Sequence, residues 1–169
     1  MIAASYAHAM ARYNQWQNDN LFGRAELLSD AERRRDAGAF FGSIHATLSH
    51  LLWGDRIWLH RFTGSARPPG GIKESVELVA SWDVLRAQRR TLDDAIIAWA
   101  GSLDPAWLDG GLTYYSGAIG ADVTKPRWLL VVHMFNNQTH HRGQVHCLLT
   151  QAGLKPSDTD IPFMPEPAS

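Results

Sequence analysis

The sequence predicts an all-α protein, a four-helix bundle with a short hairpin or irregular excursion between its third and fourth long helices. Four long stretches place apolar residues at helical spacing, and segments rich in glycine and proline separate them. Of the 169 residues, 45% are hydrophobic, enough to bury one core without disulfides or structural metals. We therefore expect a single domain over residues 1–169, in which residues 153–169 form an extended C-terminal tail.

The first two long helices are predicted at residues 2–28 and 38–62. In the first, aromatic and aliphatic side chains recur at intervals of three, four and five residues, which is mostly the spacing of one helix face. Between the two, the sequence SDAE at 29–32 has the capping-box pattern and predicts a short helical turn. The second long helix is expected to end before the breaker-rich sequence ARPPGG at 66–71.

A third helix is predicted between residues 82 and 103, with Ser75 or Ser81 as its N-cap. Residues 104–125 break the helical pattern with four glycines and two short β-prone pieces, LTYYS and ADVT. These pieces predict a small hairpin or another ordered excursion.

The fourth helix is predicted at residues 128–151. Pro126 stands where a helix favours a first-turn proline, and Gly153 is a suitable C-terminal stop. The tail beyond it contains four prolines, so we expect an extended chain. We expect the tail to pack on the bundle through its apolar side chains, Ile161, Phe163 and Met164.

Charge and cysteine content limit the class of partner. The chain carries 16 Lys and Arg against 17 Asp and Glu, so no uniform basic field exists to hold nucleic acid or an anionic membrane. We expect a small-molecule ligand or a protein partner instead. With one cysteine and no secretion signal or membrane-spanning stretch, the sequence predicts a cytoplasmic protein.

Four of the eight histidines lie in the sequence HMFNNQTHHRGQVH at 133–146. Two residues of one helix reach a common metal ion only when they are about three or four positions apart. His133 and His141 are about 12 Å apart along a helix axis, and His140 and His141 point about 100° apart. The only position that would complete a chelating pair with His141 holds Asn137. Helical geometry alone therefore gives no metal site within this segment.

The polar residues of this segment share a stripe with leucines at both ends. His133, Asn137, His141 and Gln144 fall within roughly 80° of one another. On the second long helix, small residues within about 60° of His50 predict open space beside its imidazole. Core histidines in a polar layer remain the alternative for both His50 and His141.

Two segments resemble a known family. SIHATLSHLLWGDRIWL at 43–59 and HMFNNQTHHRGQVHCLLTQAG at 133–153 strongly resemble the DinB/YfiT-like family. YNQWQN at 13–18 and TDIPFMP at 159–165 also look like that family. The resemblance therefore covers nearly the whole chain.

The resemblance implies a four-helix bundle, commonly a homodimer, with a divalent metal such as zinc or nickel held by three histidines. Their positions correspond here to His50, Asn137 and His141, so this chain has an amide where the family pattern NHxTHHRGQ has an imidazole. Related members are enzymes that depend on a low-molecular-weight thiol, while many others have no assigned reaction. Because an amide oxygen is the poorer ligand for zinc or nickel, we expect weaker metal binding or its loss.

Three functions therefore stay open. The first is a metal-dependent enzyme, or a former enzyme, of the thiol-transferase type. The second is a metal-free module that binds a small ligand. The third is a structural dimer. In the first two, further residues are expected to line the pocket or to orient the ligands: His133, His140, Trp53 and Gln144.

The neighbouring Arg142, Gly143 and Cys147 are not explained by this site. We expect Arg142 on the flank of the helix or on its exposed side, where it pairs with an acidic residue such as Asp55 or lies at a dimer interface. A glycine inside a helix usually marks close approach of another helix or backbone segment, which is our expectation for Gly143. Cys147 is expected to be a small buried group.

Overall fold

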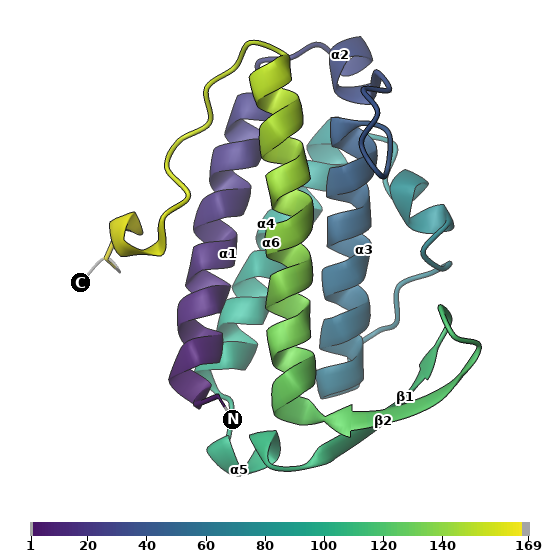
Figure 1. Cartoon of the computed structure of the whole chain (residues 1–169), viewed down its shortest axis with the longest axis vertical. Helices are drawn as coiled ribbons and strands as arrows, with labels where there is room; N and C mark the ends of the chain where they lie inside the picture. The colour runs from purple at the N-terminus through teal and green to yellow at the C-terminus, as the bar shows by residue number, and fades with distance from the viewer. Residues whose placement is uncertain (1, 167–169) are drawn as a thin grey trace.

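A computed structural model describes residues 2–166 of the chain, which form a bundle of four long helices (Figure 1). These are α1 (Ala4–Ala25), α3 (Ile44–Thr63), α4 (Trp82–Gly101) and α6 (Arg127–Gln151). The four lie close to their predicted positions, which confirms the helical bundle. None of the described helices combines the length and the apolar character needed to cross a membrane.

The bundle has an unusual order of directions. Contacts between α1 and α6 join Tyr6 to Phe135 and Asn14 to Arg142, so these two helices are parallel. The other two helices, α3 and α4, run the opposite way, as Figure 1 shows. The connection from α3 to α4 must therefore return along the length of the bundle. This return segment, residues 64–81, includes the short helix η1 (Glu74–Glu77).

The excursion before α6 is a two-stranded antiparallel hairpin, as the β-prone pieces predicted. Strand β1 (Gly111–Ser116) pairs with β2 (Ala121–Pro126), in register from Gly111 opposite Pro126 to Ser116 opposite Ala121. The fold is therefore not strictly all-α. A short helix that the sequence did not reveal, α5 (Pro105–Leu108), precedes the hairpin. A single 3-10 turn, η2 (Ile161–Phe163), lies in the tail.

The second long helix begins later than predicted, at Ile44 rather than near residue 38. Gly38 and Gly42 have φ angles of 76° and 78°, a left-handed conformation that cannot continue a helix. Ser43 then caps α3 by accepting a hydrogen bond from the backbone N–H of Ala46. Residues 36–43 consequently form a loop at the start of α3.

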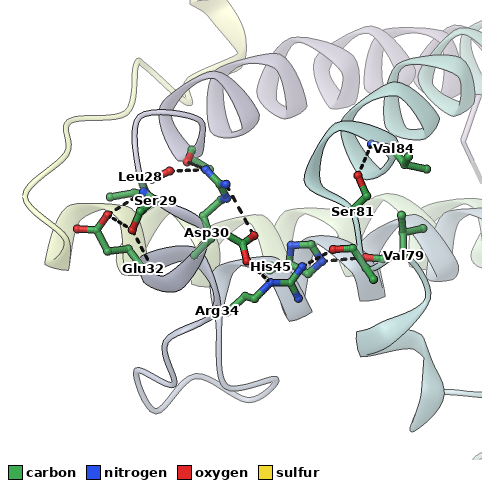
Figure 2. A network of polar contacts seen from close by, with 12 residues as sticks. Leu28, Ser29, Asp30, Glu32, Arg34, His45, Val79, Ser81 and Val84 are labelled. Atoms are coloured by element: carbon green, nitrogen blue, oxygen red, sulfur yellow. Dashed lines mark hydrogen bonds and ion pairs between the residues drawn. The ribbon is translucent and has the colours of Figure 1, made fainter.

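The predicted capping box is confirmed at the start of α2 (Asp30–Arg34), where Ser29 and Glu32 exchange hydrogen bonds (Figure 2). From α2, Arg34 donates to the carboxylate of Asp30 and to the carbonyl oxygen of Ala80. In the same view, His45 of α3 contacts the carbonyl oxygen of Val79 at 2.8 Å. These hydrogen bonds connect the end of the return segment to α2 and α3.

A deep polar layer crosses the interior of the bundle. Asp55 of α3 accepts hydrogen bonds from Arg89 at 2.6 Å and from Gln138 at 2.8 Å. Asp93 of α4 pairs with Arg89 at 2.9 Å and accepts from amide groups of α1. We use the term deep polar layer for the seven buried residues that these contacts join: Asn14, Asn18, Asp55, Arg89, Asp93, Gln138 and Arg142.

The tail follows α1 as an extended chain, but of the three apolar side chains expected to hold it only Met164 is partly buried. Ile161 and Phe163 are 50% and 64% exposed. Polar side chains of α1 bind the tail backbone instead: Tyr13 donates to the carbonyl of Thr159 at 2.7 Å, and Gln17 to that of Asp158 at 2.9 Å. Backbone hydrogen bonding therefore takes the role predicted for hydrophobic contact.

Candidate functional site

His50 of α3 and His141 of α6 meet across the seam between these two helices. Their ring centroids are 4.9 Å apart, at an interplanar angle of 76°. One turn further along α3, the side-chain oxygen of Asn137 lies 3.7 Å from the position that a Cβ atom on Gly54 would occupy. Because the two helices are antiparallel, equal steps along both keep these residues opposite each other. The seam thus brings His50, His141 and Asn137 to one place.

The hydrogen bonds around His50 determine which ring nitrogen carries the proton. The hydroxyl of Ser75, on η1, donates to the carbonyl oxygen of Ile72 at 2.6 Å. Since a hydroxyl has one proton, the 2.7 Å contact between Ser75 Oγ and His50 Nδ1 requires Nδ1–H to donate. The Nε2 atom of neutral His50 therefore keeps its lone pair.

His141 has the same tautomer through a different partner. Its Nδ1 lies 2.9 Å from Gln144 Oε1, an oxygen that can only accept, so Nδ1–H is the donor. The amide nitrogen of Gln144 in turn lies 3.3 Å from His140 Nε2, which is consistent with this orientation of the amide. Among residues 2–166, no hydrogen bond reaches Nε2 of either His50 or His141.

Both histidines are neutral at physiological pH. Burial lowers the pKa of His50 to about 4, and the neighbouring His141 contributes to the shift. Burial also lowers the pKa of His141, although the hydrogen bond to Gln144 raises it in part. A metal ligand must be deprotonated at the donor atom. The two Nε2 atoms are therefore available as donors without loss of a proton at neutral pH.

Aromatic side chains cover the histidine pair. The ring of Phe41 lies 4.0 Å from that of His50 and 5.2 Å from that of His141, between centroids. Trp53 stacks at 6.1 Å on His50, and its Nε1–H donates to the carbonyl oxygen of Pro69 at 3.0 Å. The open space predicted beside His50 is thus occupied by Phe41 from the loop before α3.

A third imidazole lies near this pair but does not converge with it on one point: the ring of His140 is 4.9 Å from that of His141, between centroids, and its Nε2 faces the Gln144 amide at 3.3 Å. Within residues 2–166, no group of three or more His, Cys, Asp or Glu side chains is placed to hold a metal ion. Asn137 supplies an oxygen donor in the seam, and Gly54 leaves room for its amide. Two imidazoles and an amide oxygen fit a divalent ion, but as a weaker donor set than three histidines.

The other predicted residues divide into two groups. Gln144 and Trp53 contact the histidine pair, as described above, and the ring of His140 packs against that of His141. His133 is separate from the pair: it packs edge-on against Trp58, with ring centroids 5.0 Å apart, two turns from His141.

Sequence reasoning missed two contributors, Phe41 and Ser75. Phe41 lies within the glycine-containing loop before α3, and Ser75 was considered only as a helix cap. Neither has a spacing relation to His50 that a sequence pattern detects, because the loop and the return segment are placed by tertiary packing. A buried histidine needs at least one hydrogen-bond partner, and that general requirement was the one available signal.

Three expectations about the neighbouring residues are wrong. Arg142 is buried at 4% exposure, and it donates to Asn14 rather than pairing with Asp55, which binds Arg89 and Gln138. Gly143 is exposed, and nothing lies within 4 Å of a Cβ atom built on it, so no other helix approaches closely. Cys147 is exposed as well. For Arg142 the cause is that α6 is rotated relative to the expected buried stripe, which places Gln138 and Arg142 inward.

Two cavities were found away from the histidine pair. One of about 390 Å³ lies between α1 and α4, and one of about 260 Å³ lies between α1, α6 and the tail. Neither is lined by any of the seven residues predicted for the site.

Comparison with known proteins agrees with this fold. The chain is 26% identical over 162 residues to protein DinB of Bacillus subtilis strain 168, which covers 93% of this chain and 92% of that protein. Its structure is similar to that of YfiT from Bacillus subtilis, with a TM-score of 0.64, 15% identity and 92% of each chain covered. YfiT is described as a probable metal-dependent hydrolase with an unusual four-helix bundle topology. A sequence model of the DinB family matches residues 1–168, and the chain therefore belongs to the DinB family.

Proposed function

We propose that this chain is a metal-dependent enzyme in which His50, His141 and Asn137 hold a divalent ion. The main support for the proposal is that the two imidazoles have the same tautomer. Each is fixed through Nδ1 by a neighbouring oxygen, and each keeps a free lone pair on Nε2. This is the arrangement in which metal-binding histidines are usually held. The description of YfiT as metal-dependent supports the same class of function.

Such an ion would lower the pKa of a bound thiol or water and so supply a nucleophile at neutral pH. The contributions of the chain itself are orientation and shielding. Ser75 and Gln144 fix the two ring orientations, and Phe41 and Trp53 exclude water from one side of the pair. Three protein ligands would leave at least one position of the ion open to a thiol, water or substrate.

Within this class we propose a thiol S-transferase type of reaction. Zinc or nickel would be the ion, a low-molecular-weight thiol the co-substrate and a small electrophile the substrate. The seam is lined by aromatic rings and neutral polar groups, which suits a small uncharged electrophile better than a polyanion. We also propose a homodimer, for which sedimentation equilibrium is the direct test.

The test is metal uptake by protein purified without a nickel column and stripped with a chelator. Zinc and nickel are titrated into wild type, His50→Ala and Asn137→His, and bound metal is measured by plasma mass spectrometry. We expect weak, stoichiometric binding in wild type, none in His50→Ala, and at least tenfold tighter binding in Asn137→His, which is ~1.4 kcal/mol. His8→Ala, an exposed histidine of α1, is the control and should match wild type.

A second function, a metal-free module that binds a small ligand, is favoured by the missing third ligand. It predicts that zinc and nickel leave the melting temperature unchanged, since an ion that does not bind the native state cannot stabilise it. If Asn137→His also fails to gain metal affinity, the metal proposal is wrong and the binding module remains.

A further inference from the structure

The side of α6 facing α1 carries a second set of functional-type residues. Thr139, Arg142, Gly143 and His146 lie within roughly 100° of one another, on a different side of the helix from His141. They form one wall of the cavity of about 260 Å³. The rest of its lining comes from α1 and the tail: Tyr13, Gln17, Leu21 and Thr159.

Arg142 is a buried cation without a carboxylate in contact. Its guanidinium donates to the side-chain oxygen of Asn14, and at 3.4 Å to the hydroxyl of Thr139. Over residues 2–166, no carboxylate oxygen lies within ion-pair distance of it. The charge of Asp55 acts on Arg142 without an ion-pair contact, and Asp93 is linked to it through Asn14, which donates to Asp93 at 3.1 Å. Buried cations normally contact an anion directly, so this guanidinium has capacity for one more acceptor.

Gly143 gives an independent indication of a ligand. A glycine inside a helix costs about 0.5–1 kcal/mol relative to alanine, a loss that close packing against another element usually explains. Here nothing lies within 4 Å of the position of a Cβ atom. A side chain at position 143 would extend into the cavity beside Arg142.

From these two observations we propose that the cavity between α1, α6 and the tail binds a small oxyanion, a carboxylate or phosphate, on the Arg142 guanidinium. The planar guanidinium suits two oxygens of one such group. The volume lies below the roughly 300–1,000 Å³ of pockets for drug-sized ligands, which limits the ligand to a small ion or the acidic end of a larger molecule. His146 and Thr139 flank the arginine on the same wall.

The tail forms the cover of this site. Thr159 lines the cavity, and its carbonyl oxygen accepts the hydroxyl of Tyr13 at 2.7 Å. Asp158 and Asp160 on either side of Thr159 are exposed, and neither lines the cavity. Their carboxylates therefore do not occupy the place of the oxyanion. The site requires neither the histidine pair nor a metal, so it stands apart from the function proposed above.

The test uses the whole chain with inorganic phosphate and acetate as probes, at constant ionic strength set with chloride. Binding is measured by calorimetric titration and by the shift in melting temperature. At about 100 times its Kd, a bound anion raises the melting temperature by roughly 5–10 °C. Binding of phosphate alone indicates a phosphate site, and binding of acetate as well indicates a carboxylate site.

Two variants locate the binding. Gly143→Leu fills the cavity without removing Arg142 and should weaken binding at least tenfold, ~1.4 kcal/mol. Gly23→Leu is the matched control, since Gly23 is also a helical glycine with open space around it, but it lines the other cavity. Arg142→Lys keeps the charge and loses the planar fork, so it should weaken binding while the protein stays folded.

Two results would overturn the proposed anion site. If neither probe binds the wild-type chain, the cavity is not an anion site. If Gly143→Leu and Gly23→Leu bind the probe as wild type does, the anion binds elsewhere and the proposal is overturned. Metal titration of the same samples, which the proposal expects to be unchanged in Gly143→Leu, separates this result from any failure at the histidine pair.

Discussion

The deep polar layer and the histidine pair are both buried polar clusters, yet they are completed in opposite ways. In the deep polar layer, each carboxylate accepts from at least two donors on other helices. The two positive charges of Arg89 and Arg142 balance the two negative charges of Asp55 and Asp93. In the histidine pair, each ring uses Nδ1, and no residue in the described part of the chain forms a hydrogen bond with its Nε2.

This difference separates polar groups that hold the fold from polar groups that await a ligand. Burial of an ion is tolerated only when donors or opposite charges replace water, as they do around Asp55 and Asp93. A neutral imidazole with one free lone pair costs much less to bury. The pair can therefore be incomplete in the protein alone, while the carboxylates of the deep polar layer cannot.

The largest expected effect comes from breaking the deep polar layer. Asp55→Ala leaves Arg89 and Gln138 without their acceptor and should lower the free energy of unfolding by about 3–5 kcal/mol. The matched control is Asp30→Ala, which removes an exposed ion pair with Arg34 and should cost about 0–1 kcal/mol. His50→Ala removes no ion and should cost less than Asp55→Ala. Urea denaturation measures all three, and equal losses would contradict the comparison.

The second prediction concerns the pH dependence of stability. Burial raises the pKa of Asp93 to about 6, against the lowering effect of Arg89, while Asp55 raises it further. Because the folded pKa lies above the ordinary value of 3.8, the contribution of Asp93 to stability is largest below pH 3.8 and is lost as the pH rises through 6.

As the pH rises from 3.8 to 6, the free energy of unfolding should fall by at most about 3 kcal/mol. Denaturation of wild type and Asp93→Asn at several pH values checks this, since the asparagine keeps the shape and cannot titrate. The variant should show a flatter profile between pH 4 and 6, so its difference from wild type should change over this range. An unchanged slope would mean that another group is responsible.

The third prediction concerns the orientation of His50. Ser75→Ala removes the acceptor that fixes Nδ1–H and should weaken metal binding about 10–100-fold, because such supporting contacts tune a ligand strongly. Ser49→Ala is the control: Ser49 donates to the backbone oxygen of Ser75 at 2.8 Å and does not contact the imidazole. It should lower stability by about 1 kcal/mol and leave metal affinity unchanged. Similar affinity losses in both variants would indicate a general disturbance of the return segment.

The smallest effect is expected at Gly143. Gly143→Ala should raise the free energy of unfolding by about 0.5–1 kcal/mol, because the helix gains a better helix former and nothing obstructs the new methyl group. Gly153→Ala should do the opposite, since Gly153 has a φ of 83° that alanine adopts with strain. Melting temperatures of the two variants measure the contrast. A loss of stability in Gly143→Ala would show that the helix backbone needs glycine there for a reason other than the cavity.

Local sequence was sufficient for most of the architecture. Apolar spacing located the four long helices, the SDAE sequence located the start of α2, and the β-prone pieces located both strands of the hairpin. These features depend on contacts within a few residues, so the chain specifies them without knowledge of its neighbours. The predicted start of the second long helix was wrong, because Gly38 and Gly42 adopt left-handed conformations that apolar spacing does not reveal.

The sequence by itself also determined that Asn137, rather than an imidazole, is the residue one turn before His141, since a step of four along a helix is fixed by helix geometry. Only the tertiary structure decided how α6 is rotated in the bundle. Polar residues lie on every side of this helix, so burial of Gln138 and Arg142 depends on partners from other helices. The return of residues 64–81 along the bundle likewise brought Ser75 to His50, a contact between elements whose relative position no local spacing fixes.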